Sequence, residues 1–131
     1  MDAIERRDIL APQANPNGSR DYVVILRGER AVSANGPVSA TVILRYVPDR
    51  FVLPVESFQA YLDRIAGIDW PSLEAAAAAV LDDIANEVLA RWSQVTLRVA
   101  DEDGSGGHEI AMEDHQPGWH NEDLLYRLPP V

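Results

Sequence analysis

The sequence contains no cysteine, and this absence removes several kinds of chemistry at once. Without a thiol the chain forms no disulfide, no thiolate metal site and no thiol nucleophile. Cysteine-poor chains are typical of the reducing cytoplasm, so a cytoplasmic location is expected. The first ten residues include acidic side chains and lack an apolar central block, so they do not resemble a secretory signal.

Long apolar runs are also missing, and basic residues are outnumbered by acidic ones. No apolar run approaches the roughly 20 residues that a membrane-spanning helix needs, so no membrane partner is expected. Eleven Lys and Arg residues stand against 21 Asp and Glu residues, which gives a net charge of −10. Such a surface repels phosphate backbones and argues against a nucleic-acid partner. The simplest role of this charge is to keep the protein in solution.

The length and composition fit one folded domain with short extensions. A chain of 131 residues with 47% hydrophobic content can build one core but is too short for two comfortable ones. Residues 1–20 hold turn-forming residues without periodicity, which predicts a flexible or partner-docked N-terminal arm. Residues 21–114 form the predicted domain. Residues 115–131 carry several large apolar side chains and are predicted to be a docked C-terminal tail.

Hydrophobic periodicity predicts the order β-β-α-α-β-β inside this domain. Strands are expected within residues 21–32, 39–47, 94–99 and 108–113, and helices over residues 55–66 and from about 70, with Pro71 in the first turn, to about 92. Gly67 is expected to end the first helix and Asp69 to cap the second. The arrangement predicts an α+β domain with an antiparallel sheet and the helices on one face. The second helix is expected to bury Leu73, Ala77, Val80, Leu81, Ile84 and Val88, and to turn Asp82, Asp83 and Glu87 outward.

The stretch from Pro37 to Leu62, together with this order of elements, carries a family resemblance. It resembles the queuosine-pathway nitrile reductases (QueF), whose sequences have a strand ending in Tyr-Val-Pro-Asp and a following helix with Tyr-Leu. The likeness extends over about residues 22–113. It implies the tunnelling fold, a homo-oligomeric ring and a pocket between subunits. The residues that match without a gap are Pro37, Ala40-Thr41, Tyr46-Val47-Pro48-Asp49 and Tyr61-Leu62.

The groups that carry out the family's reaction are absent from the matching positions. Family enzymes reduce 7-cyano-7-deazaguanine with NADPH, through a cysteine that attacks the nitrile and an aspartate that handles protons. On the ungapped register these positions are Ala31 and Val38. The family's cofactor-binding lysine has no match near Glu56 and Ser57, and the arginine of a later Arg-Gly-Gly is Ser105. We therefore expect no catalytic residue from this set, no NADPH cofactor and no nitrile reduction.

Glu74 is the clearest ligand-binding residue that the resemblance implies, and Glu56 and Ser57, which match the family's binding segment only with a two-residue shift, are further ligand-binding candidates. Glu74 matches a glutamate that pairs with the purine-like ring, if one residue is inserted before the second helix; the preceding histidine becomes Leu73. One carboxylate can accept hydrogen bonds from two adjacent N–H and amino groups of such a ring. The structural alternative is that Glu74 simply benefits from the dipole in the first turn of a helix.

The remaining polar clusters indicate no metal site. His115 and His120 lie near acidic residues, but their spacing matches no established zinc pattern. Residues 101–103 are interpreted as a solvated acidic turn and residues 104–107 as a hairpin turn. Trp70 is expected to pack against the helix that follows it.

The leading hypothesis is a QueF-like, queuosine-related protein without reductase chemistry. It would bind a purine-, deazaguanine- or pterin-like ring through Glu74, as a cytoplasmic homo-oligomer. One alternative is an enzyme with a different reaction on a related heterocycle, with Glu56, Ser57 or a tail histidine as candidates. Another is a structural or interaction protein with an empty pocket. Assembly is also favoured by the strand at residues 22–26, apolar on both faces, and by the open edges of a short sheet.

Overall fold

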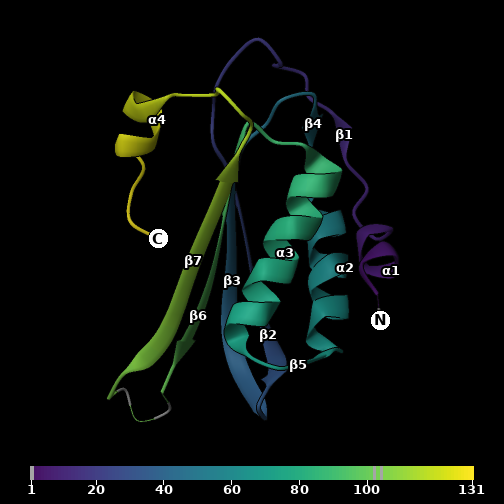
Figure 1. The fold of residues 1–131 in the computed structure, drawn as a ribbon, viewed down its shortest axis with the longest axis vertical. Coiled ribbons are helices and arrows are strands. Elements are labelled where there is room, and N and C mark those ends of the chain that lie inside the picture. Colours follow the sequence, from purple (N-terminus) through teal and green to yellow (C-terminus); the bar gives the residue numbers. More distant parts are fainter. Residues whose placement is uncertain (1, 102, 104) are drawn as a thin grey trace.

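The central element is a twisted sheet of five strands in the order β5-β2-β3-β6-β7 (Figure 1). In the computed structural model, which describes residues 2–101, 103 and 105–131, the four long strands are antiparallel neighbours. The short β5 (Asp69–Trp70) joins β2 in parallel. The long strands are β2 (Val24–Ala34), β3 (Pro37–Val47), β6 (Trp92–Ala100) and β7 (Gly107–His115). The turns predicted at 101–107 include Glu102 and Gly104, which lie outside the described residues.

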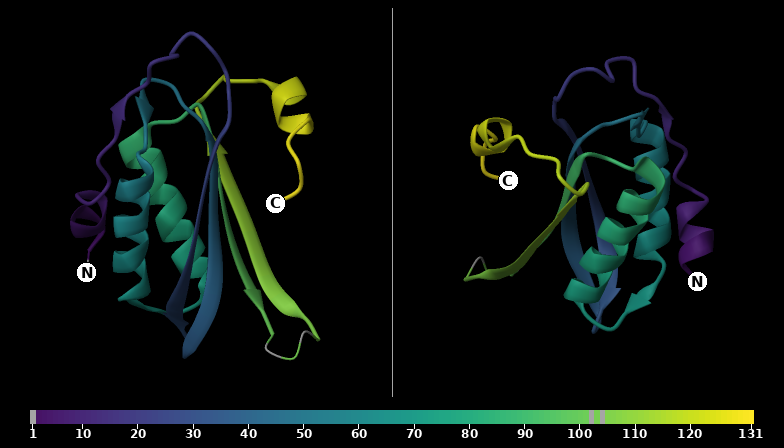
Figure 2. Two further views of the ribbon diagram at one scale, coloured as in Figure 1. Left: turned by 180° about the vertical axis from the view of Figure 1, so that it is seen from behind. Right: turned by 45° about the horizontal axis from the view of Figure 1, so that its top comes forward.

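Two long helices, α2 (Val55–Ala66) and α3 (Leu73–Val88), lie side by side on one face of the sheet (Figures 1 and 2). The bounds predicted for α2 are confirmed, and Gly67 is its C-cap. The second helix is shorter than predicted, because Leu89 adopts the left-handed conformation with φ 53° and ends the hydrogen-bonded ladder. No helix in the described part of the chain is long and apolar enough to cross a membrane.

The N-cap of α3 differs from the sequence-based expectation. Ser72, not Asp69, caps the helix, and its hydroxyl accepts a hydrogen bond from the backbone N–H of Ala75 at 3.0 Å. Asp69 lies in β5 instead. The cap satisfies one of the N–H groups that the first helical turn leaves without a partner.

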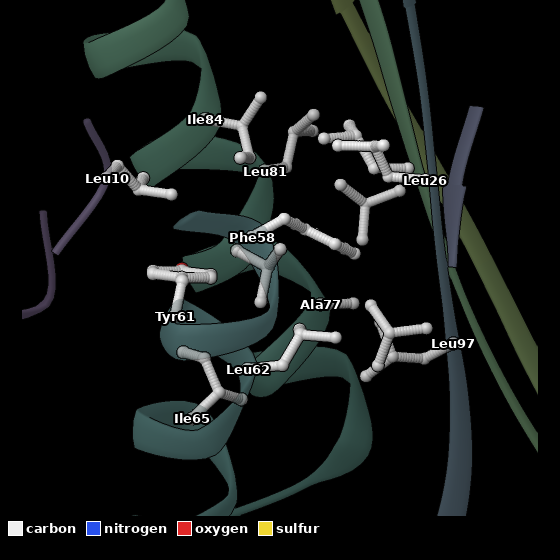
Figure 3. Packing of buried hydrophobic residues seen from close by; sticks show 14 of the residues in the cluster. Leu10, Leu26, Phe58, Tyr61, Leu62, Ile65, Ala77, Leu81, Ile84 and Leu97 are labelled. Atoms are coloured by element: carbon white, nitrogen blue, oxygen red, sulfur yellow. The ribbon is translucent and has the colours of Figure 1, made fainter. Parts of the chain in front are cut away.

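The core lies between the two helices and the sheet (Figure 3). The stripe predicted for α3 is confirmed, because all of its members are buried. Close helix–sheet approach depends on Gly28 in β2, where an added Cβ would lie 2.4 Å from Cδ1 of Leu62. Helix α2 contributes Phe58, Tyr61, Leu62 and Ile65 to this core. The sheet contributes Leu26, Val42, Leu44, Tyr46, Val95 and Leu97.

The N-terminal segment, predicted as an arm, is folded against the helices. It forms α1 (Ala3–Arg7) and β1 (Gln13–Ala14), which pairs with β4 (Phe51–Val52). Leu10 between them is buried in the core cluster. The segment therefore contributes to the same hydrophobic core as α2 and α3.

The C-terminal tail lies on the face of the sheet opposite to α2 and α3 (Figure 2). It contains the short helix α4 (Glu122–Tyr126). Arg45 of β3 donates a hydrogen bond from Nη1 to the carbonyl of Pro129 at 2.7 Å, and Asn121 donates to Asp21 at 3.0 Å. These hydrogen bonds, together with those of Gln116 to Asp49 and of Arg98 to the carbonyl of Val131, attach the tail to the domain.

Asp83 corrects one prediction, because its side chain points inward rather than into solvent. The side chain is fully buried and accepts hydrogen bonds from Arg6 Nε at 2.8 Å, Arg7 Nε at 2.9 Å and the Tyr61 hydroxyl at 2.5 Å. The face of α3 that meets α1 and α2 is thus partly ionic. Two guanidinium groups and a phenol stabilise the buried charge, as a buried carboxylate requires.

This buried cluster changes the protonation of its other members. Burial, followed by the hydrogen bond to Asp83, raises the pKa of the Tyr61 phenol above its ordinary value. The hydrogen bond to Asp83 raises the pKa of Arg6. Arg6 also lies over the ring of Trp70, with its guanidinium carbon 5.6 Å from the ring centroid. Trp70 packs against the core, and its indole N–H donates to the carbonyl of Ile65 in the preceding helix α2 at 3.1 Å.

Candidate ligand pocket around Glu74

A cavity of about 320 Å³ lies at the N-terminal end of α3. Its volume is at the lower end of the range for small-molecule sites, which suits a single small ligand better than a dinucleotide. The cavity is formed by the β2–β3 hairpin, the first turn of α3 and the strands β6 and β7. Its lining residues are Ala34, Asn35, Val38, Ser72, Leu73, Glu74, Val99 and His108.

The hairpin turn brings β2 and β3 to one edge of this pocket. Asn35 and Gly36 both have positive φ, at 59° and 101°, which is the backbone of a tight hairpin turn. Asn35 tolerates this conformation better than most side chains do. Its amide donates a hydrogen bond to the carbonyl of Pro71 at 3.3 Å. The hairpin is thereby tied to the segment that leads into α3.

Glu74 lies in the first turn of α3, directly after the Ser72 cap and Leu73. Its side chain is 57% exposed, and Oε1 is 3.3 Å from Nε2 of His108. Within the described part of the chain, Oε2 of Glu74 accepts no protein hydrogen bond. The N-terminal end of a helix interacts favourably with an acidic side chain at this position. Glu74 therefore keeps unused acceptor capacity at the cavity.

The other walls of the pocket set its chemistry. Val38, Leu73 and Val99 are apolar, while His108 and Ser72 bring donor groups. A flat ring can cover the apolar walls and direct its own N–H groups to Glu74. The pocket thus has the mixture of apolar surface and few polar groups that is typical of small-ligand sites.

The place of His108 in the pocket does not follow from the sequence, which predicts only a strand over residues 108–113. His108 lies opposite Val99 in the β6–β7 ladder. It shares its side of β7 with Ile110 and Met112, which pack against the core. Strand alternation could therefore have placed His108 on the helix side of the sheet, but not beside Glu74.

The two positions that match the family's cysteine and aspartate are separated by the sheet. In the β2–β3 register, Ala31 is opposite Ser39, and Val38 is opposite Val32. Successive strand residues point to opposite faces. Val38 accordingly lines the pocket with Glu74, whereas Ala31 is exposed on the other face. Of these two residues, only Val38 lines the cavity of its own chain.

Glu56 and Ser57 lie at the other end of the helix pair. They begin α2 near β4, whereas Glu74 begins α3 near β5 (Figure 1). A helix of 12 residues places these ends about 18 Å apart. Ser57 Oγ accepts a hydrogen bond from the Ala11 N–H at 2.8 Å and donates to the Ile9 carbonyl at 3.2 Å. Ser57 thus holds the N-terminal segment, and Glu56 is exposed.

The tail histidines form no cluster with the pocket. His115 contacts the carbonyl of Gln116 through Nδ1 at 2.9 Å. His120 is 3.9 Å from Glu122, with both side chains mostly exposed. In the described ranges, no group of three or more His, Cys, Asp or Glu side chains is arranged to hold a metal ion.

Comparisons with known proteins relate this architecture to one group. No family model matches the chain. The NADPH-dependent 7-cyano-7-deazaguanine reductases of two strains of Acidithiobacillus ferrooxidans are 27% identical to it over 122 residues, which cover 90% of this chain and 85% of each relative. The crystal structure of the archaeosine synthase QueF-Like in the apo form matches 70% of this chain and 91% of its own, with a TM-score of 0.57 and 19% identity.

The chain is thus similar in sequence to QueF reductases and in fold to a QueF-like protein. The α+β tunnelling fold predicted from the sequence is confirmed, with its antiparallel long strands and both long helices on one face. The QueF-like chain adds to the predicted order the short elements α1, β1, β4, β5 and α4.

Proposed function

We propose that this QueF-like chain binds a purine-, deazaguanine- or pterin-like heterocycle in the pocket at Glu74 and does not reduce a nitrile. The observation that carries this proposal is a half-exposed carboxylate with a free oxygen, set beside a cavity with apolar walls. A carboxylate at this place can accept two hydrogen bonds from the adjacent N–H and amino groups of such a ring.

Two kinds of side chain are missing for the reductase reaction. The sequence contains neither cysteine nor lysine, so no thiolate can attack a nitrile and no lysine can bind a cofactor phosphate at any position. Val38, which lines the pocket at the aspartate position, cannot transfer a proton. These substitutions support ligand binding without the chemistry of the curated relatives, and without NADPH.

Assembly into a ring is part of the same proposal. Among the described strands, β7 has no neighbour on its outer edge, and β5 pairs with β2 only at Ser33 and Ala34. Open edges of this length favour pairing with another strand. A second copy beside β2 or β7 would add walls to the pocket. Light scattering after size-exclusion chromatography tests the oligomeric state independently of any ligand.

The function is tested by thermal unfolding with guanine, 7-cyano-7-deazaguanine and pterin, and with adenine as the matched control. A compound that binds is expected to raise the Tm by about 5–10 °C at a concentration near 100 times its Kd. Adenine has an amino group, but the neighbouring ring nitrogen N1 carries no hydrogen, so adenine cannot offer both donors to one carboxylate. It is expected to raise the Tm by less.

Other outcomes separate the alternatives. No shift with any compound would contradict heterocycle binding and favour a structural or interaction role. Loss of NADPH absorbance with 7-cyano-7-deazaguanine would contradict the absence of reductase activity. A new product from a bound compound without NADPH would indicate a different reaction on a related heterocycle.

A further inference from the structure

His108 lies where it can contact a second polar group of the ligand that Glu74 is proposed to bind. Its Nε2 lies 3.3 Å from Oε1 of Glu74, and both side chains line the same cavity. The pair joins the first turn of α3 to the second residue of β7. Both side chains are a little more than half exposed, at 55% and 57%, so an incoming molecule can reach them.

We propose that His108 is a specificity-determining residue of this pocket, which donates from Nε2 to a ring carbonyl that adjoins the N–H bound by Glu74. This inference rests on the proposed function, and it narrows the ligand class. The preferred heterocycle carries, along one edge, an amino group, a ring N–H and a carbonyl. Rings that lack the carbonyl are expected to lose the contribution of His108.

The geometry follows from the position of Nε2. When the carboxylate accepts from an amino group and a ring N–H, the carbonyl next to that N–H lies close to one of the two carboxylate oxygens. A donor already held against Oε1 is then within reach of this carbonyl as well. Contact with Glu74 also favours the form of His108 that carries a proton on Nε2. The empty pocket therefore presents an acceptor and a donor side by side.

If His108 had only a structural role, its substitution would not change the affinity for one ligand relative to another. Contacts between exposed polar side chains contribute little to folding, so loss of the His108–Glu74 contact is expected to change the free energy of unfolding only slightly. The chain has a second exposed pair of the same type, His120 with Glu122 at 3.9 Å, which lies outside the Glu74 cavity. His120 thus provides a matched control for the loss of one histidine from a His–Glu pair.

The test is isothermal titration calorimetry with guanine and 2-aminopurine. Guanine has the carbonyl, whereas 2-aminopurine keeps only the amino group of that edge, because it lacks both the carbonyl and the hydrogen on N1. It is therefore expected to bind the wild type more weakly than guanine does. The His108→Ala variant is expected to bind guanine about tenfold more weakly than the wild type, and 2-aminopurine within about twofold. His108→Gln, which retains an N–H donor, is expected to recover part of the guanine affinity. The control variant His120→Ala is expected to bind both compounds as the wild type does.

The outcomes distinguish this inference from the function on which it rests. If guanine binds and requires Glu74, but His108→Ala binds it unchanged or weakens both compounds equally, the role of His108 is contradicted and the pocket stands. If the wild type binds neither these compounds nor any member of the panel above, the proposed function fails and the role of His108 fails with it. Unchanged Tm values of the ligand-free variants confirm that folding is intact.

Discussion

Two of the four carboxylates of helix α3, Asp83 and Glu74, have opposite surroundings. Asp83 is fully buried and accepts four hydrogen bonds, two from Arg6, one from Arg7 and one from Tyr61. Glu74 is 57% exposed and has one contact, at 3.3 Å, with His108. The acceptor capacity of Asp83 is therefore filled by its own chain, whereas that of Glu74 is mostly free.

This difference separates a structural carboxylate from a candidate binding carboxylate. A buried charge must be paired and fully hydrogen-bonded, so the surroundings of Asp83 stabilise the position of the N-terminal segment on α2 and α3. Glu74 has no such need, because water reaches it. Its side chain lines a cavity of about 320 Å³. We expect substitutions at the two sites to affect different properties.

The largest effect is expected from Asp83→Ala. The substitution leaves two part-buried guanidinium groups and the Tyr61 hydroxyl without their common partner. The free energy of unfolding should fall by about 3–5 kcal/mol, measured by urea denaturation. The matched control is Asp82→Ala, an exposed neighbour on the same helix, which should change it by less than about 0.5 kcal/mol. A loss below about 1 kcal/mol at Asp83 would remove the distinction between the two carboxylates.

An intermediate effect is expected from Tyr61→Phe, and it should depend on pH. Near neutral pH the loss of one hydrogen bond to Asp83 should cost about 1–2 kcal/mol. Because burial raises the pKa of Tyr61 above its ordinary value of 10.0, the folded state retains a proton that the unfolded state releases. The contribution of Tyr61 to the free energy of unfolding is complete below about pH 10 and decreases as pH rises above that value.

Urea unfolding between pH 8 and pH 11 measures this pH dependence of the free energy of unfolding. Above pH 10 the wild type should lose up to about 1.4 kcal/mol per pH unit more than Tyr61→Phe does. Tyr46→Phe serves as a comparison, because burial also raises the pKa of Tyr46, which lies outside the Asp83 cluster. Parallel wild-type and Tyr61→Phe curves would contradict the assignment of a raised pKa to Tyr61.

The smallest effect on stability is expected from Glu74→Gln. The variant loses a favourable interaction with the helix dipole and an exposed contact with His108, which together contribute less than about 1 kcal/mol. The Tm of the ligand-free protein should therefore change by only a few degrees. A loss as large as that of Asp83→Ala would show that Glu74 is a structural residue.

The parts of this fold with local periodicity could be predicted from the sequence. The helix at Val55–Ala66 and the stripe from Leu73 to Val88 follow from 3.6-residue spacing, which acts within each segment. The strands β1, β4 and β5 have two residues each, too few for any period to be recognised. Their pairing depends on the surrounding tertiary structure.

The candidate site could be predicted only in part, because it depends on contacts between distant segments. Glu74 was identified by its resemblance to a family position, but the cavity beside it is assembled from separate strands and a helix. His108 is 34 positions further along the chain than Glu74, and nothing local indicates their contact. The burial of Asp83 was missed for the same reason, since Arg6 is 77 positions away.

The central claim is that Glu74 is the ligand-binding carboxylate of α3. Isothermal titration calorimetry of guanine with the wild type and Glu74→Gln tests it most directly, because glutamine keeps the shape of the side chain and removes its charge. The expected result is a loss of affinity of about tenfold to 100-fold, the usual contribution of a hydrogen bond to a charged group. Guanine binding of equal affinity in both proteins would contradict the claim.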